Sequence, residues 1–265
     1  MKHGEHKPAP ATQPRSEPKP APQGGRSQAT DMAGHRYGTG AALQSPRMPK
    51  ANSDPAPAVQ SQLEKACADL RERFGAQLQA GSAATGVPEA AAAAMILAEQ
   101  QLARAAGTDV PLRFEPYVFF QETGRWLVAT HKDQAAEQRA FSEAQAIDPQ
   151  AAFESVRMGI AQLSGREATA AGHESPEAML GAMRQAPEAQ VSSLFSVIAA
   201  DADLRGALAA EDWRAVAQLR AGPGYGALGY DDALAAGAEL YRRAEKAAGG
   251  GDDDDSPKKP RKKRG

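Results

Sequence analysis

The chain has 265 residues, with 31 lysines and arginines, 33 aspartates and glutamates, and one cysteine, Cys67. A single cysteine excludes an intramolecular disulfide and a cysteine-based zinc site, and the absence of a run of 18 apolar residues argues against a membrane-spanning helix. Residues 59–248 carry 17 basic and 25 acidic side chains, a net charge of −8 that disfavours general nucleic-acid binding by this part.

We expect the first 58 residues to form a disordered, proline-rich arm. Ten of the 19 prolines lie there, Tyr37 is its only aromatic residue, and no apolar periodicity is present. Such a segment cannot bury enough apolar surface to offset the entropy lost on ordering. The opening "MKHGEHKPAP" also lacks the apolar core of a secretory signal, so we expect synthesis in the cytoplasm.

The first predicted helix covers residues 59–80. Apolar side chains recur there at helical spacing: Leu63, Cys67, Leu70, Phe74 and Leu78. This stripe predicts an amphipathic helix with Cys67 in the core.

The second predicted helix runs from Pro88 to about residue 106. Proline suits the first turn of a helix, and Gly107 is expected to end it. The segment is rich in alanine, which favours helix and lets neighbouring helices approach closely.

The segment "LRFEPYVFFQETG", residues 112–124, fits two interpretations. Its aromatic residues suit a strand, whereas Pro116 after Glu115 suits the start of a short helix. We expect helix here.

The later helices are predicted from their capping signals. Asp133, Asp148 and Asp212 suit N-caps, and Gly222 suits a C-cap. We expect helices over residues 133–147, 149–164 and 230–248, and others starting near residues 175, 186 and 212. The prediction is an all-α domain of eight or nine helices over residues 59–247, without a strand.

The C-terminal residues 248–265 are expected to be a disordered tail. After a glycine run come four aspartates and then six basic residues. The simplest interpretation is a solvated extension, although the basic run 258–264 is a candidate binder of nucleic acid or another anionic polymer.

No metal or cofactor is expected. His3 and His6 flank Glu5 without the spacing of a zinc protease, and the other histidines stand alone in the sequence. The segment "GHRYGTG" lacks the preceding strand and the lysine of a phosphate-binding loop.

Four segments occur in a suggestive order. They are "ILAEQ" (96–100), "FEPYVFFQETG" (114–124), "ESVRMGIAQLSG" (154–165) and "AGPGYGALGYD" (221–231). In this order they resemble the N-acetylmuramidase domain of phage-type endolysins, a branch of the lysozyme-like superfamily. The resemblance covers roughly residues 88–245 and implies a lysozyme-like fold. It also implies that the ligand is a peptidoglycan glycan strand.

The resemblance implies that Glu99 is the catalytic residue. In the family an early helix ends in a glutamate that donates a proton to the leaving glycosidic oxygen. Judged without the resemblance, a glutamate at the edge of an apolar face more often points to water. The resemblance further implies four candidate substrate-binding residues: Glu115, Gln162, Tyr225 and Tyr230. For Glu115 a place near a helix cap, and for Gln162 a satisfied buried amide, are the simpler alternatives.

The chain departs from the family where substrate contacts are expected. The serine–tryptophan pair of the third segment is Arg157–Met158 here, its phenylalanine is Ala161, and the tyrosine–asparagine pair before the glycine-rich loop is Arg220–Ala221. Two interpretations therefore stay open. One is a peptidoglycan hydrolase, of reduced activity, that uses Glu99. The other is a catalytically degenerate glycan-binding or structural module, for example of a phage-tail-like injection particle.

Delivery to the cell wall would then need another route. Release on cell lysis and carriage by an injection particle are both compatible with the sequence. The proline-rich arm is a candidate loading segment for such machinery.

Overall fold

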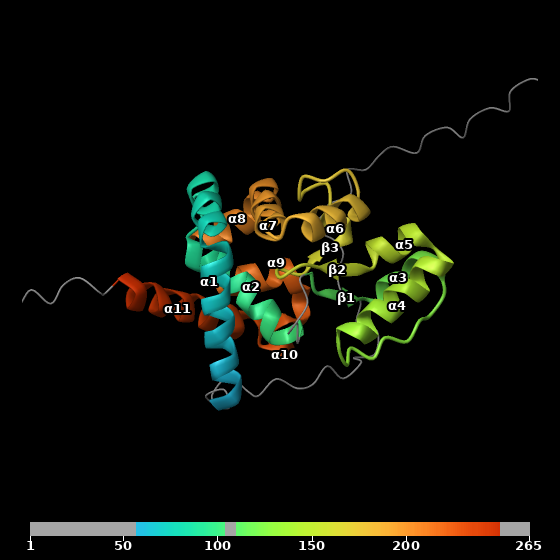
Figure 1. Ribbon diagram of the computed structural model, residues 1–265, viewed down its shortest axis with the longest axis horizontal. Helices are drawn as coiled ribbons and strands as arrows, with labels where there is room; N and C mark the ends of the chain where they lie inside the picture. Colours follow the sequence, from blue (N-terminus) through green and yellow to red (C-terminus); the bar gives the residue numbers. More distant parts are fainter. Residues whose placement is uncertain (1–56, 104–109, 250–265) are drawn as a thin grey trace, which may run out of the picture. The chain divides into compact units, whose positions relative to one another are not determined.

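The computed structural model describes residues 57–103 and 110–249 (Figure 1). The α-helices are α1 (Pro57–Thr85), α2 (Glu89–Ala103), α3 (Pro116–Thr123), α4 (Gln134–Ile147), α5 (Pro149–Glu154), α6 (Pro176–Gln185), α7 (Ala189–Ala200), α8 (Ala202–Ala209), α9 (Trp213–Ala221), α10 (Tyr225–Leu228) and α11 (Tyr230–Gly249). The mainly helical fold class predicted from the sequence is confirmed. The predictions for residues 1–56, for Gly107 and for residues 250–265 lie outside the described residues.

The prediction that the domain lacks strands is wrong. Strands β1 (Leu112–Phe114), β2 (Val156–Met158) and β3 (Leu163–Ser164) form an antiparallel sheet in the order β1-β2-β3. Each strand has only two or three residues, too few to show the alternation that identifies a strand in a sequence. Segment 112–124 combines both interpretations, since a strand precedes Glu115 and a helix follows it.

The helix predicted over residues 149–164 ends at Glu154, so the prediction of a helix over residues 155–164 is wrong. The chain turns back there through β2 and β3, and Gly165 comes close to the end of α5. A Cβ atom on Gly165 would lie 1.8 Å from the carbonyl oxygen of Phe153, so only glycine fits at this crossing. The short 3-10 helix η1 (Gly165–Glu167) follows at once.

The predicted caps are confirmed. The side chain of Asp133 accepts a hydrogen bond from the amide of Ala136, and Asp148 does the same for Ala151. Asp212 caps α9, and Gly222 ends it with a φ of 70°. These signals are local, which is why the sequence alone could place them.

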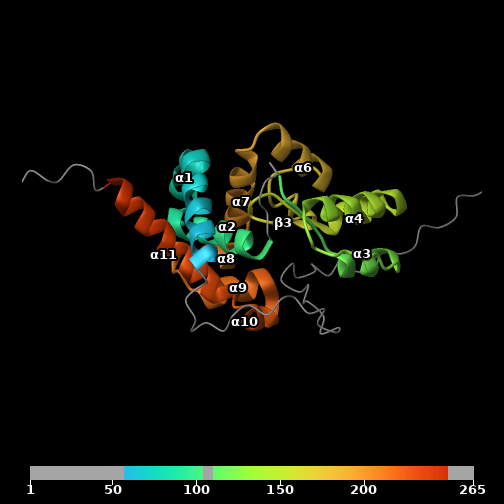
Figure 2. The ribbon, with the colours of Figure 1, turned by 60° about the horizontal axis from the view of Figure 1, so that its bottom comes forward.

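The core of the domain contains the pair α2 and α11, and α1 packs on both (Figures 1 and 2). Residues 90–94 of α2 are all alanines and all buried. A Cβ atom on Gly237 of α11 would lie 3.2 Å from the Cα of Ala94, so the two backbones are close. Small residues on both helices therefore set the distance between them.

Two hydrogen bonds connect α2 and α11 at opposite ends of their contact. The Tyr230 hydroxyl donates to Glu99, and the Tyr241 hydroxyl donates to Glu89. The helices therefore run antiparallel, with the C-terminal part of α2 beside the start of α11.

The stripe predicted on α1 faces the core. Cys67, Leu70, Phe74 and Leu78 are buried, and Leu63 is partly buried. Among residues 57–103 and 110–249, no helix has the length and apolar character needed to cross a membrane.

Candidate active site

Glu99 and Tyr230, 131 positions apart in the sequence, are in direct contact. The Tyr230 hydroxyl donates a 2.7 Å hydrogen bond to Oε1 of Glu99. Glu99 is 8% exposed and Tyr230 is 2% exposed. The structure thus brings together two of the residues singled out in the sequence, in a site almost closed to solvent.

The backbone places Tyr230 at the first position of α11. Gly229 adopts a φ of 63° and ends α10, after which the chain enters α11 directly. Burial raises the pKa of the Tyr230 phenol well above its ordinary value, and the Glu99 carboxylate raises it further. The phenol therefore keeps its proton and remains a donor to Glu99.

Two ion pairs lie close to this contact. On β2, Nε of Arg157 donates a 2.8 Å hydrogen bond to Oε1 of Glu115, the residue before α3. On α9, Nη1 of Arg220 donates to Oε1 of Glu167 at the end of η1. The Arg220 side chain is only 8% exposed. We call Glu99, Glu115, Arg157, Glu167 and Arg220 the charged cluster.

The cluster is electrostatically connected. Burial alone would raise the pKa of the Glu167 carboxyl, but the guanidinium groups of Arg220 and Arg157 and a hydrogen bond from the Ser164 amide hold it below its ordinary value. Burial would likewise lower the pKa of Arg220, but Glu167 outweighs it and the pKa is raised. Both Glu167 and Arg220 therefore stay charged at neutral pH.

The hydrogen bonding of Arg220 is incomplete within the described residues. Its Nε and Nη2 atoms are buried and have no hydrogen-bond partner there. Unpaired buried donors carry a desolvation cost, so the Arg220 charge depends strongly on the one carboxylate of Glu167.

Gln162 holds a turn of the sheet. It lies between β2 and β3 with a φ of 48°, and its Nε2 donates to the carbonyl oxygen of Gly159 at 2.9 Å. Arg157 adds a 3.4 Å contact from Nη1 to the carbonyl oxygen of Gln162. The amide side chain thus supports the strand that carries Arg157.

Tyr225 lies in the glycine-rich segment that connects Arg220 to Tyr230. The segment consists of the 3-10 helix η2 (Gly222–Gly224) and α10, and neither contains a buried residue. Tyr225 is half-buried against the core, and the structure gives it no hydrogen bond to the charged cluster. The segment therefore does more than reverse the chain, because Arg220 and Tyr230 of the candidate active site lie at its two ends.

Three residues of the cluster are absent from the sequence-based set. The sequence identifies Arg157 and Arg220 only as departures from the family pattern, and it does not identify Glu167. A local signal for Glu167 exists in the capping box with Ser164, in which the Glu167 side chain accepts from the Ser164 amide. Its pairing with Arg220, 53 positions away, has no local signal.

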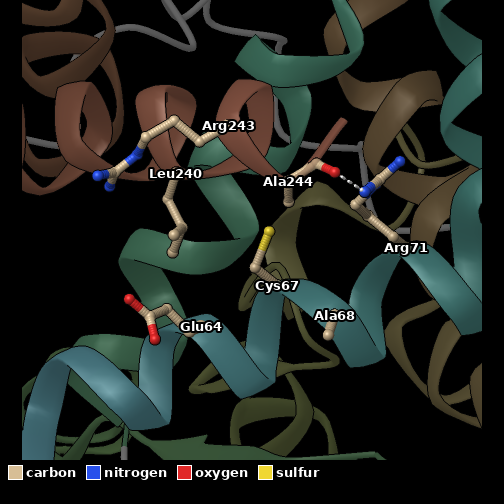
Figure 3. Close-up of a pocket in the computed structure, with 7 residues that line it drawn as sticks. All are labelled: Glu64, Cys67, Ala68, Arg71, Leu240, Arg243 and Ala244. Atoms are coloured by element: carbon tan, nitrogen blue, oxygen red, sulfur yellow. Dashed lines mark hydrogen bonds between the residues drawn. The ribbon is translucent and has the colours of Figure 1, made fainter. Parts of the chain in front are cut away.

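A separate hollow of about 330 Å³ lies between α1 and α11 (Figure 3). Its lining consists of Glu64, Cys67, Ala68, Arg71, Leu240, Arg243 and Ala244. Arg71 donates to the carbonyl oxygen of Ala244, and the side chain of Arg243 points away from Cys67. None of the residues predicted as site residues lines this hollow, so it is not part of the candidate active site.

Over the two described ranges, no three or more His, Cys, Asp and Glu side chains are grouped so as to hold a metal ion. His131 instead contacts Glu137, with 2.7 Å between Nδ1 and Oε1, and His173 contacts Ser193.

Comparison with known proteins adds two findings. A family model described as N-acetylmuramidase matches residues 87–243. The crystal structure of a Burkholderia AP3 phage endolysin is similar with a TM-score of 0.53 and 24% sequence identity, over 64% of this chain and 70% of that chain. A search of curated proteins gave no match. The structural similarity confirms the expectation that the chain shares the mainly helical fold of a phage endolysin.

Proposed function

This chain belongs to the N-acetylmuramidase family, and from that premise we propose that its helical domain binds a peptidoglycan glycan strand and cleaves it with Glu99 as general acid. Peptidoglycan is the substrate class that the family implies. The bond cut would be the one between N-acetylmuramic acid and N-acetylglucosamine.

The observation that carries this proposal is the contact between Glu99 and Tyr230. A protonated carboxyl has one O–H donor and keeps acceptor capacity on its other oxygen. Tyr230 donates to Oε1, so in the protonated acid the proton sits on Oε2. Oε2 is then the atom that gives its proton to the glycosidic oxygen.

Tyr230 acts in this proposal as a positioning residue. Its side chain is buried and its hydroxyl is committed to Glu99, so it fixes the orientation of the carboxyl without touching the sugar. This revises the role of substrate binder that the resemblance implied for Tyr230.

Within the described residues, neither arginine of the charged cluster forms an ion pair with Glu99. Arg157 is paired with Glu115, and Arg220 is paired with Glu167. The proposed acid is therefore not committed to an ion pair when the substrate arrives.

A second candidate function is glycan binding without turnover, and the residues at the departing positions favour it. Met158 and Ala161 are buried in the core, while Arg157 and Arg220 are held in ion pairs. These side chains replace ones expected to position the sugar. Poor positioning alone lowers a rate by about 10²-fold, so this candidate predicts weak or no turnover.

The test compares two glutamates of α2, each bonded to a tyrosine of α11. Purified chain and its variants Glu99→Gln and Glu89→Gln are incubated with a peptidoglycan suspension, and loss of turbidity is followed. We expect Glu99→Gln to lower the rate by about 10²–10⁴-fold, because an amide has no proton of suitable acidity to donate, and Glu89→Gln to keep it.

The possible outcomes separate the candidates. Turnover that survives Glu99→Gln rules out Glu99 as the acid. A wild-type chain that sediments with peptidoglycan but never clears it supports the second candidate function.

A further inference from the structure

Three aromatic side chains are unusually exposed on α3 and the segment that follows it. Tyr117 is 40% exposed, Phe120 is 42% exposed and Trp126 is 48% exposed. Trp126 is one of only two tryptophans in the chain. Large aromatic side chains dominate the energetics of cores and interfaces, so three of them left open together indicate a surface that binds something.

Two of the three rings are in contact, and the third lies on the same side of α3. The ring centroids of Phe120 and Trp126 are 5.9 Å apart with an interplanar angle of 64°, an edge-to-face arrangement. Tyr117 is three residues before Phe120 on α3, so the two side chains lie on the same side of the helix. We call Tyr117, Phe120 and Trp126 the aromatic platform.

The helix that carries the platform is held by an ion pair at each end, the first of them inside the charged cluster. Glu115 precedes α3 and is held by Arg157. Near the other end, Glu122 pairs with Arg166, the neighbour of Glu167 in η1. The two pairs hold the platform in place relative to the cluster, and Phe120 lies about 6 Å further along α3 than Pro116, the residue after Glu115, at 1.5 Å per residue.

The chemistry around the rings suits a carbohydrate. A pyranose ring offers an apolar C–H face for stacking and a rim of hydroxyl groups for hydrogen bonds. The platform supplies rings together with the Tyr117 hydroxyl, and the exposed side chains of Gln121 and Arg125 lie beside it in the sequence.

We propose that the aromatic platform stacks on sugar rings of a peptidoglycan glycan strand, beyond the residues that would hold the scissile bond at Glu99. This rests on the proposed function only for the identity of the strand. The strand runs from the charged cluster along α3, so that a longer glycan gains contacts that a short one cannot make.

Trp126 itself reports on the proposal. In full-length Trp213→Phe, Trp126 is the only tryptophan. Addition of a soluble N-acetylglucosamine hexamer, or of glycan strands freed of peptide, should change its fluorescence in a saturable way. In this background Phe120→Ala and Tyr117→Ala should each weaken binding by about 3–10-fold, the range expected for loss of one stacked ring. Circular dichroism checks that the variants fold.

The matched control is Ile147→Ala, which removes an apolar side chain of similar exposure from α4. It should leave the affinity unchanged. Equal affinity of Phe120→Ala and its parent, or no response of Trp126 at saturating glycan, would overturn the proposal. So would self-association of the chain that Trp126→Ala abolishes, because the platform would then bind a second copy.

The outcome is separable from that of the proposed function. If the platform variants clear peptidoglycan with the same KM as their parent, the proposed activity stands and the proposed role of the platform is wrong. If the chain never clears peptidoglycan but the fluorescence of Trp126 responds to glycan, the platform stands as a binding surface and the proposed activity is wrong.

Discussion

Among the described residues, the hydroxyl of Tyr230 is the hydrogen-bond donor that the structure gives Glu99. We predict that Tyr230→Phe lowers kcat by about 10–100-fold and leaves KM nearly unchanged, because a hydrogen bond to a charged or reacting group contributes about 1.5–3 kcal/mol. Steady-state kinetics on soluble glycan would measure the effects on kcat and on KM separately. Tyr241→Phe, which removes the matching bond to Glu89, should keep kcat, and an equal loss in both variants would show that the effect is structural.

The buried tyrosines also make the free energy of unfolding vary with pH in the alkaline range. Burial raises the pKa of Tyr230 and of Tyr241, and Glu99 and Glu89 respectively raise them further. In the unfolded chain both phenols ionise near their ordinary pKa of 10.0. Their contribution to stability is therefore full below pH 10 and is lost as the pH rises towards the folded-state pKa values. Each phenol should cost about 1.4 kcal/mol at one pH unit above 10.

Urea unfolding at pH 8 to 11 would measure this loss. Tyr241→Phe should make the decline shallower, because phenylalanine does not ionise. A decline of the same steepness in this variant would show that other groups control alkaline stability.

Among the elements, the close contact of α2 and α11 determines where Tyr230 meets Glu99. We predict that Gly237→Val lowers the free energy of unfolding by about 1–3 kcal/mol, because its side chain meets the backbone of Ala94. Gly181→Val on α6 is the control, since a Cβ atom there meets nothing within 4 Å and the change should be close to neutral. Equal effects of the two substitutions in thermal or urea unfolding would contradict this account.

The pair between α9 and η1 gives a second prediction at this scale. Glu167→Gln should lower the free energy of unfolding by about 3–5 kcal/mol at neutral pH, because it leaves the buried charge of Arg220 uncompensated. The folded-state pKa of Glu167 is depressed below its ordinary value of 4.5. The carboxylate of the wild type thus adds to the free energy of unfolding above pH 4.5, and this contribution is lost as the pH falls below 4.5. The free energies of unfolding of the wild type and of Glu167→Gln should therefore converge in acid.

The control for this prediction is the more exposed pair of Glu122 and Arg166. Glu122→Gln should cost less than about 1 kcal/mol, as is usual near the surface. Denaturant unfolding of both variants at pH 7 and at about pH 2.5 would show the contrast, and a pH-independent deficit of Glu167→Gln would speak against a charge effect.

How much of the structure the sequence could predict depends on the distance along the chain over which each sequence pattern acts. Caps such as Asp133 and Gly222 act within one helical turn, and the apolar stripe of α1 repeats over many residues, so both were predicted correctly. Strands of two or three residues carry no such pattern. The pair of Arg220 and Glu167 forms only when distant elements pack, and no local rule predicts it. Glu99 and Tyr230 were found through the resemblance, but their contact required the structure.

For the molecule as a whole, the family assignment and the fold agree on a domain that acts on peptidoglycan. The boundaries of 59 and 247 remain predictions, although α1 and α11 extend close to both. The arm as a loading segment and the basic run 258–264 as a polyanion binder also remain predictions, since both lie outside the described residues.

The most direct test of the account identifies the sugar at each newly formed chain end. Peptidoglycan treated with the full chain is reduced with labelled borohydride, and the labelled ends are hydrolysed and identified. We predict that the label appears on muramic acid, and that Glu99→Gln lowers its amount by about 10²–10⁴-fold while still sedimenting with peptidoglycan. Label on glucosamine alone, or an undiminished yield of labelled muramic acid from Glu99→Gln, would contradict the central claim.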